Sequence, residues 1–306
     1  MQVTVTQLTD QLVASYARQG GINHLDGKNL PSKTRISDIS CSLLRLLFPG
    51  YFDDKVILAS EIKVETATLM DYVLTHLEDE IRKSLEYHPP EGMAVREITM
   101  AANSITLEFL SKLPHIRELL QTDTDAAYNG DPAALSREEV IVAYPFVETI
   151  AVQRLAHELY LKNVPLIPRI MTEWAHSRTG IDLHPGTTIG SHFFIDHGTG
   201  AVTGETSVIG NHVKIYQGVG LVAKSLSGGQ ALHGKKRHPT VEDRVTIYAN
   251  ATIVGGDTVI GAGSTIGANV FLLHSVPPDS LVLMEDVNVK VISKTTRSSA
   301  AVDFEI

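Results

Sequence analysis

The sequence has few of the residues that mark secreted, membrane-bound or nucleic-acid-binding proteins. Its single cysteine, Cys41, excludes an internal disulfide and a metal site built from several thiolates. No window approaches the roughly 18 consecutive apolar residues of a membrane-spanning helix. The segment from Met1 to Asp10 lacks the basic-then-apolar layout of a signal peptide. These absences predict a protein of the reducing cytoplasm.

Positive charge is also in deficit, because 26 basic residues stand against 35 acidic ones, for a net charge of −9 over 306 residues. An acidic chain argues against nucleic acid and against an anionic membrane surface as partners. Charged residues make up 20% and hydrophobic residues 43% of the chain, values typical of a folded globular protein. We therefore expect no nucleic acid and no membrane among its partners.

Glycine is scarce in the first part of the chain, since 17 of the 23 glycines fall at or after Gly180. Before that point apolar residues recur at helical spacing, for example every fourth residue from Leu69 to Leu85. The pair Ser136 and Glu139 has the spacing of a helix capping box. Cys41 falls in this region, and we expect it at a buried helix position. The first part therefore predicts packed helices.

The second part follows a period of six residues. The positions that are apolar or small are Leu183, Ile189, Ile195, Ala201, Ser207, Val213 and Val219, then Val241, Ile247 and Ile253, and, after one extra residue, Ile260, Ile266 and Leu272. A period of six fits neither an α-helix nor an amphipathic strand. It is typical of a hexapeptide β-helix, in which about 18 residues close one triangular coil. The eleven or twelve repeats predict close to four coils.

Two segments depart from this repeat. Residues 220–240 interrupt it, and we expect them to leave the prism as a loop, which is a frequent place for function. The end of this loop, Lys235 to Pro239, is basic and can serve as an anion clamp or simply as a solvated tip. From Ser293 the chain is polar and is expected to form an exposed tail.

Histidine is concentrated in the repeat region, where seven of the thirteen histidines lie between His176 and His238. In one interpretation His197 is a base oriented by Asp182, fifteen residues earlier and slightly less than one coil away. In a second, His184, His192 and His197 join histidines of a neighbouring subunit around a metal ion. In a third, the histidines only cap strands and fill subunit contacts. The spacing leaves all three open.

Several stretches together resemble the serine O-acetyltransferases of cysteine biosynthesis. The stretches are Asn129-Gly-Asp-Pro-Ala133, Asp182-Leu-His-Pro-Gly186, Phe194-Ile-Asp-His-Gly-Thr-Gly200, Gly204-Glu-Thr206, Tyr216-Gln-Gly-Val219, Arg237-His-Pro239 and Ser275-Val-Pro-Pro278. They follow the order of the family over roughly half the chain. Several matched residues lie outside the six-residue pattern, so the resemblance is more than the repeat that all hexapeptide β-helices share. Leu283-Met-Glu-Asp286 resembles a longer, less studied branch of the family.

The resemblance implies a role for each matched residue. His197 corresponds to the general base that takes the proton from the serine hydroxyl, and Asp182 to its orienting partner. Asp131 and Asp196 correspond to the carboxylates that hold the substrate ammonium. The groups expected to grip the substrate carboxylate are Arg237 and His238.

The resemblance also implies acetyl-CoA as the co-substrate and no metal. In the family CoA lies in a groove between adjacent prisms that is lined by small residues, and the positions expected there are Ala223, Ala249 and Ala268. Val222 and Ala223 stand where family members usually carry a glycine pair, a departure that bears on the pantetheine contact.

The partners implied are L-serine, acetyl-CoA and further copies of the chain. Flat prisms usually trimerise with active sites between subunits, so we expect a homotrimer or a dimer of trimers. Family members commonly end in a tail whose terminal isoleucine plugs O-acetylserine sulfhydrylase, and this chain ends in Ile306.

The predicted fold class is α+β, with an N-terminal helical region followed by a left-handed parallel β-helix of hexapeptide repeats. We expect a helical domain over residues 1–180, an acyltransferase β-helix over 181–290 and a flexible tail over 291–306. The predicted activity is serine O-acetyltransfer. The alternatives are an acetyltransferase for another acceptor, homoserine or a sugar, and a metal-dependent enzyme of the carbonic anhydrase type.

Overall fold

The first part of the chain is helical. The computed structural model describes residues 3–285 except 91, 226 and 233, so the predicted tail and Ile306 lie outside the described residues. Its α-helices are α1 (Val5–Arg18), α2 (Lys33–Leu47), α3 (Ile62–Tyr87), α4 (Val95–Ser111), α5 (Leu113–Gly130), α6 (Arg137–Ala143), α7 (Pro145–Leu161) and α8 (Ile167–Thr179). The predicted cap of α6 is confirmed, since the Ser136 side chain accepts the Glu139 N–H at 3.1 Å. No described helix is both long and apolar enough to cross a membrane.

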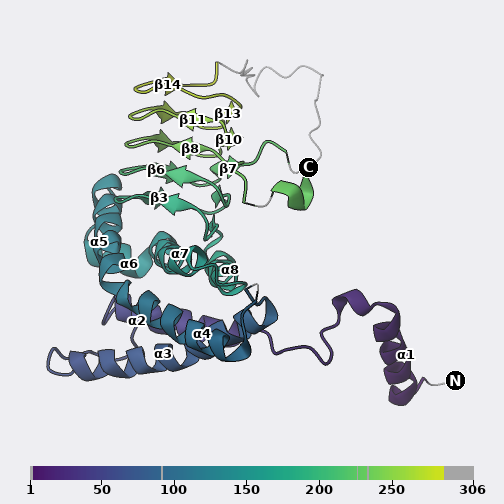
Figure 1. Cartoon of the computed structure of the whole chain (residues 1–306). Coiled ribbons are helices and arrows are strands. Elements are labelled where there is room, and N and C mark those ends of the chain that lie inside the picture. Colours follow the sequence, from purple (N-terminus) through teal and green to yellow (C-terminus); the bar gives the residue numbers. More distant parts are fainter. Residues whose placement is uncertain (1–2, 91, 226, 233, 286–306) are drawn as a thin grey trace.

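The second part is a prism of short parallel strands (Figure 1). The strands are β1 (Asp182–Leu183), β2 (Thr188–Ile189), β3 (Phe194–Asp196), β4 (Val202–Thr203), β5 (Val208–Ile209), β6 (Lys214–Tyr216), β7 (Gly220–Val222), β8 (Thr240–Val241), β9 (Thr246–Ile247), β10 (Thr252–Val254), β11 (Val259–Ile260), β12 (Thr265–Ile266), β13 (Phe271–Leu272) and β14 (Leu281–Val282). They form three sheets in the orders β1-β4-β7-β10-β13, β2-β5-β8-β11 and β3-β6-β9-β12-β14. The described strands make nearly five coils, one more than the repeat predicted.

The first coil is larger than the next. Asp182 pairs with Val202, twenty residues on, whereas Val202 pairs with Gly220, eighteen residues on. The inward residue that follows Leu183 in its sheet is Thr203, not Ala201, so the single phase predicted across this corner is wrong. The period of six hid the insertion because Ala201 is itself fully buried and occupies a second inward position. The extra residue predicted higher in the prism is confirmed, since Thr240 pairs with Val259, nineteen residues on.

The predicted loop leaves the prism, but over a shorter range than 220–240, because Gly220–Val222 forms β7 and Thr240 begins β8. Val208 pairs with Thr240, thirty-two residues on, so the chain between β7 and β8 forms a long excursion beside the third coil. Within it Gly229–Leu232 forms a short 3-10 helix. The loop returns to the prism at Arg237 and His238, whose backbone N–H groups both donate to the Thr206 hydroxyl.

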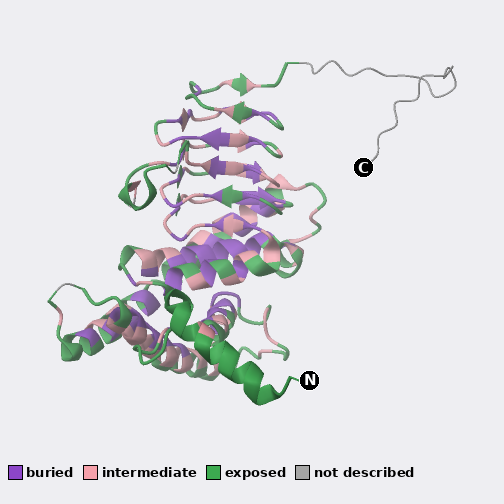
Figure 2. Ribbon diagram, turned by 90° about the vertical axis from the view of Figure 1, so that its right-hand side faces the viewer, coloured by how far each residue is buried: buried purple, intermediate pink, exposed green. Residues whose placement is uncertain are grey.

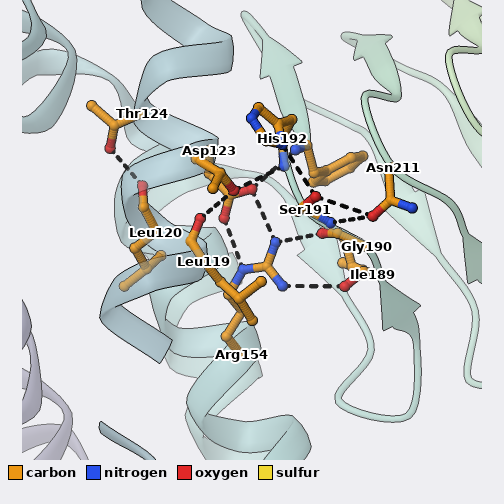
Figure 3. A network of polar contacts seen from close by, with 12 residues as sticks. Leu119, Leu120, Asp123, Thr124, Arg154, Ile189, Gly190, Ser191, His192 and Asn211 are labelled. Atoms are coloured by element: carbon orange, nitrogen blue, oxygen red, sulfur yellow. Dashed lines mark hydrogen bonds and ion pairs between the residues drawn. The ribbon is translucent and has the colours of Figure 1, made fainter. Parts of the chain in front are cut away.

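The helical region is tied to the first coil by a buried polar network (Figure 3). Arg154 of α7 donates to both carboxylate oxygens of Asp123 on α5, at 2.8 and 2.9 Å. Its other N–H groups donate to the carbonyls of Ile189 and Gly190 at 3.2 and 2.7 Å. Asp123 also accepts the Phe193 N–H at 3.0 Å. Two helices and the start of β3 are therefore fixed to one another by a single ion pair.

Burial follows this architecture (Figure 2). The helices beneath the prism and the inner faces of the sheets are buried, whereas α1 has no buried residue and projects from the body (Figures 1 and 2). Cys41 is exposed, so the expectation of a buried position is wrong. In α2 the neighbouring Ser40 and Ser42 turn inward with Ile39 and Leu43, which leaves Cys41 on the solvent side.

Candidate active site

One cluster of predicted site residues surrounds a cavity of about 330 Å³ between the helices and the first coil. Asp131 is the C-terminal cap of α5, Asp196 ends β3, and His197 begins the enlarged corner after it. Tyr144, the N-cap residue of α7, closes the cavity from the helical side. The structure therefore brings Asp131, Asp196 and His197 together, as their predicted roles require.

The carboxylates of this cavity are held by residues that the sequence did not single out. The Tyr144 hydroxyl donates to Asp131 Oδ2 at 2.5 Å, and the Ala133 N–H donates to Oδ1 at 2.8 Å. The phenol and this N–H keep the pKa of Asp131 below its usual range, and the same hydrogen bond raises the pKa of Tyr144 to about 12. A carboxylate so stabilised stays ionised and can accept from an ammonium group.

A lysine joins the two acids of the cavity. The ammonium of Lys214 donates to the Gly130 carbonyl at 2.7 Å, directly before Asp131, and lies 3.3 Å from Asp196 Oδ2. It also lies over the ring of Phe194, 5.0 Å from its centroid. With two carboxylates and one ammonium the cavity carries one net negative charge, which matches a single cationic group on a ligand.

His197 is exposed at a corner of the prism. Its backbone has a φ of +60°, in the left-handed region, and its side chain is 71% exposed. The nearest carboxylate oxygen, on Asp196, lies 3.8 Å from Nδ1, beyond hydrogen-bonding distance. Within the described residues no hydrogen bond or ion pair joins His197 to Asp182, the partner that the sequence predicted.

Asp182 lies instead on the outer face of β1. Its Oδ1 atom is buried and accepts no hydrogen bond from the described part of the chain. The nearest cation is the Arg169 guanidinium, with 4.0 Å between Nη1 and Oδ1. The Asp182 side chain as a whole is 22% exposed, so its exposed part lies away from the buried Oδ1 atom.

His238 belongs to a second cluster of predicted site residues and is buried. Its Nδ1 accepts the Thr206 N–H at 3.1 Å, so in the neutral ring Nε2 carries the proton and is a donor. Burial, with Arg237 next to it, lowers the pKa of His238 to about 4. The ring lies against Gly204, where an added Cβ would be 2.0 Å from the His238 Cδ2 atom. His184 is kept neutral in the same way, because burial lowers its pKa to about 4.

Arg237 completes the second cluster. One of its terminal nitrogens donates to Glu205 Oε2, and the phenol of Tyr160 donates to Glu205 Oε1 at 2.8 Å. The sequence placed Glu205 only within a matched motif and did not single out Tyr160. Arg237 and His238 thus share a region with Glu205 and Tyr160, separate from the cavity around His197. Asp182 contacts Arg169 and lies on the first sheet.

The two clusters flank the same sheet of the prism. The corners between the third and the first sheet form the His197 edge, which comprises residues 197–201, 217–219, 248–251 and 267–270. The corners between the first and the second sheet form the Arg237 edge, which comprises residues 184–187, 204–207, 255–258 and the described residues of 223–239. Ala249 and Ala268 lie on the His197 edge in successive coils, where the Asn269 N–H donates to the Ala249 carbonyl at 2.9 Å. Ala223 lies on the Arg237 edge.

The histidines considered as metal ligands do not meet within a protomer. His184 follows β1, His192 precedes β3 and His197 follows it, so the three occupy different corners of the prism. Among the described residues the one group with metal-ligand spacing is Glu173, His176 and Asp182. An arginine, Arg169, lies 2.6 Å from Glu173 and within 4.0 Å of Asp182, and its positive charge opposes a bound cation there.

The sequence relatives and the similar solved structures belong to the same family. No family model matches the chain. The chain is 44% identical over 265 residues to a plasmid-encoded serine acetyltransferase of Synechococcus elongatus, covering 83% of this chain and 81% of the relative. It is 44% identical over 164 residues to the serine acetyltransferase of Mycobacterium tuberculosis, covering 54% and 69%.

Solved structures agree with the sequence relatives. Serine acetyltransferase isoform 3 of Entamoeba histolytica, in complex with cysteine, superposes with a TM-score of 0.72 at 32% identity, covering 94% of this chain and 95% of that one. The serine acetyltransferase of Neisseria gonorrhoeae, in complex with serine, gives 0.53 at 26% identity, covering 88% and 100%. The predicted left-handed parallel β-helix behind a helical region is thereby confirmed.

The fold and the exposed corner histidine beside paired carboxylates define a β-helix acyltransferase. Within this class, the chain is 44% identical to a serine acetyltransferase and covers 81% of the length of that relative. The chain belongs to the serine acetyltransferase family.

Proposed function

We propose that the protein transfers the acetyl group of acetyl-CoA to the hydroxyl of L-serine, giving O-acetylserine and CoA. The observation that carries this proposal is the charge pattern along the two edges of one sheet. The His197 edge ends in an acidic cavity suited to an ammonium group, and the Arg237 edge presents an arginine and a neutral histidine donor suited to a carboxylate. Serine carries both charged groups on its Cα atom, and its hydroxyl is one carbon away.

The substrate ammonium is held by Asp131 and Asp196. Asp131 is fixed by Tyr144 and Asp196 lies next to Lys214, so both carboxylates are oriented before the substrate arrives. The substrate carboxylate is held by the guanidinium of Arg237 and the Nε2–H of His238. A sugar has neither charged group, and homoserine places its hydroxyl one methylene further away.

The complete site forms between adjacent subunits of a trimer. In a closed ring of three identical prisms, the His197 edge of one protomer can face the Arg237 edge of the next. This arrangement brings the exposed part of an Asp182 carboxylate toward His197, which has no hydrogen-bonded carboxylate within the described part of its own chain. The partner subunit's Asp182 then orients His197 and stabilises its imidazolium.

The reaction follows from this placement. His197 accepts the proton of the serine hydroxyl while the hydroxyl oxygen attacks the thioester carbonyl carbon. The new C–O bond forms, and negative charge develops on the carbonyl oxygen, where a backbone N–H donor stabilises it. The intermediate collapses with cleavage of the C–S bond, and the imidazolium returns its proton to the departing CoA sulfur.

Acetyl-CoA lies along the His197 edge. Ala249 and Ala268 lie in the third and fourth coils of this edge, and their small side chains favour close approach of an extended pantetheine arm. Ala223 contributes from the opposite side of the groove, on the Arg237 edge of the adjacent protomer. No metal takes part in these steps.

Product release with different acceptors tests the proposal. Purified protein is mixed with acetyl-CoA and L-serine, and in parallel with homoserine and with a sugar, and free CoA is measured. We expect release with serine at least about tenfold above the other acceptors. Equal release with all three would contradict the assignment of the two charged subsites. L-cysteine keeps both charged groups, and a relative was solved with cysteine bound; it should therefore compete with serine.

Three further assignments rest on the sequence. We place the protein in the cytoplasm, divide it at residues 180 and 290, and pair its C-terminal Ile306 with O-acetylserine sulfhydrylase. Deletion of Ile306 followed by a sedimentation measurement with the sulfhydrylase tests the last of these, and unchanged association would contradict it.

A further inference from the structure

The arginine assigned to the substrate carboxylate is held by a chain of contacts that begins in the helical region. Tyr160 lies near the end of α7, and its phenol donates to Glu205 Oε1 at 2.8 Å. The second oxygen of the same carboxylate, Oε2, accepts from Arg237 Nη2. Glu205 is 9% exposed and the Arg237 side chain 21%, so these contacts are shielded from water.

The site is shaped around this chain of contacts. The Tyr160 ring lies over Gly186, where an added Cβ would be 2.9 Å from the ring Cζ and 2.8 Å from the Glu205 carbonyl oxygen. The edge of His184 packs against the same ring at a centroid distance of 6.0 Å. Only a residue without a side chain at Gly186 therefore lets the phenol reach the carboxylate.

The remaining contacts of Arg237 restrict its position further. Its Nη1 donates to the carbonyls of Leu232 and Lys235 at 3.2 and 3.4 Å. Its backbone N–H donates to the Thr206 hydroxyl at 2.9 Å. The carbonyls of Leu232 and Lys235 occupy part of the guanidinium group. A guanidinium has five N–H donors, so others remain for a ligand.

We propose that Tyr160 and Glu205 are positioning residues that hold the Arg237 guanidinium in the orientation that receives the substrate carboxylate. The inference rests on the proposed function, which assigns Arg237 to that carboxylate. Glu205 has two oxygens and two donors, so each donor occupies one oxygen. Without the phenol, Oε1 is left buried and unpaired, and the carboxylate turns to engage Arg237 with both oxygens. The guanidinium is then drawn away from the substrate.

The Tyr160→Phe variant tests this chain, because it removes one hydroxyl and keeps the ring. We expect the KM for L-serine to rise about tenfold, which corresponds to ~1.4 kcal/mol. The kcat and the KM for acetyl-CoA should stay within about twofold, since neither depends on the carboxylate. L-serinamide lacks the carboxylate, so its binding and turnover should be the same in the variant and the wild type.

A hydrogen-bonded tyrosine outside the site provides the control. Tyr72 accepts from Arg35 at 3.3 Å between α2 and α3, remote from both edges of the prism. Tyr72→Phe should leave both KM values unchanged. Arg237→Lys alone should raise the KM for serine, and adding Tyr160→Phe to it should produce little further rise, because the phenol acts through the guanidinium.

The outcomes separate positioning from a purely structural role. An equal loss for serine and serinamide, or a Tyr160→Phe effect that adds fully to Arg237→Lys, would overturn the proposal. Restoration of the serine KM in Glu205→Asp but not in Glu205→Gln would support it, because only a carboxylate holds the guanidinium. Calorimetric titration with L-serine gives the same comparison without turnover. If the wild-type protein binds serine but releases no CoA, only the proposed function is contradicted. If it binds serine and serinamide with equal affinity, the proposed role of Tyr160 and Glu205 is contradicted.

Discussion

Replacement of Arg154 by methionine should destabilise the protein more than any single change at the active site. The side chain makes four hydrogen bonds, two to Asp123 and one each to the carbonyls of Ile189 and Gly190. Methionine has a similar length and no charge. In the variant, Asp123 keeps only the Phe193 N–H as a donor, although its side chain is 1% exposed.

The size of the effect follows from the burial of the orphaned charge. Removing one partner of a buried ion pair costs about 3–5 kcal/mol, because the other charge stays desolvated and uncompensated. For a chain of this size one kcal/mol lowers the thermal midpoint by roughly 2–4 °C, so we expect a fall of about 6–20 °C. Solvent screening reduces this little, since the two side chains are only 5% and 1% exposed.

The reasoning also predicts that a second change recovers stability. In the double variant Asp123→Asn/Arg154→Met the buried charge is gone, and the asparagine oxygen still accepts the Phe193 N–H. The double variant should therefore unfold at a higher temperature than Arg154→Met alone. Thermal unfolding is followed by circular dichroism at one protein concentration, because subunit association makes the midpoint concentration-dependent. A single variant within 2 °C of the wild type, as an approximate threshold, or a double variant less stable than the single, would refute the argument.

Three further predictions concern the site. His197→Asn should lower kcat by about 10²–10⁴-fold. The thermal midpoint should change little, because asparagine accepts the left-handed backbone at this corner, and His212→Asn, at φ +56°, is the control. Turnover retained in His197→Asn would exclude His197 as the base. Burial lowers the pKa of His184 and His238 to about 4, so the unfolded chain binds protons below pH 6.5 that the folded chain does not. The folded state is therefore most favoured above pH 6.5 and loses stability as the pH falls toward 4. A thermal midpoint that increases as the pH is lowered over this interval would contradict the prediction. Gly204→Ala should displace the His238 ring and raise the KM for serine about tenfold while that for acetyl-CoA is unchanged; equal rises in both would point to general damage.

The repeat in the sequence predicted the architecture because every inward position of a β-helix has the same requirement. An apolar or small residue must recur each time the chain turns inward, so a local pattern reports the whole prism. The helical part was predictable for a similar reason, since apolar stripes and caps are local. The number of coils was underestimated because β14 lies beyond Leu272, the last position of the repeat, and its inward residue Val282 is half-exposed.

What the sequence did not predict depends on contacts between distant segments. The ion pair of Asp123 and Arg154 joins residues 31 apart on separate helices, and no periodicity marks it. Tyr160 reaches Glu205 across 45 residues for the same reason. The residues of the candidate site were named from motifs, but their division into two clusters was not, because it depends on which corner of the prism each residue occupies.

The helices protect only one end of the prism, and this sets an order of local stability. The first coil packs on α5, α7 and α8, whereas β13 and β14 at the other end have a neighbouring strand on one side among the described residues. In a linear stack of repeats, opening begins at the uncapped end and propagates inward. Amide hydrogen exchange should therefore be slowest around Asp196 and faster in each later coil. The corner that we assign to serine is therefore expected on the most rigid coil, and the stretch near Ala268 that we assign to CoA on one that opens more readily.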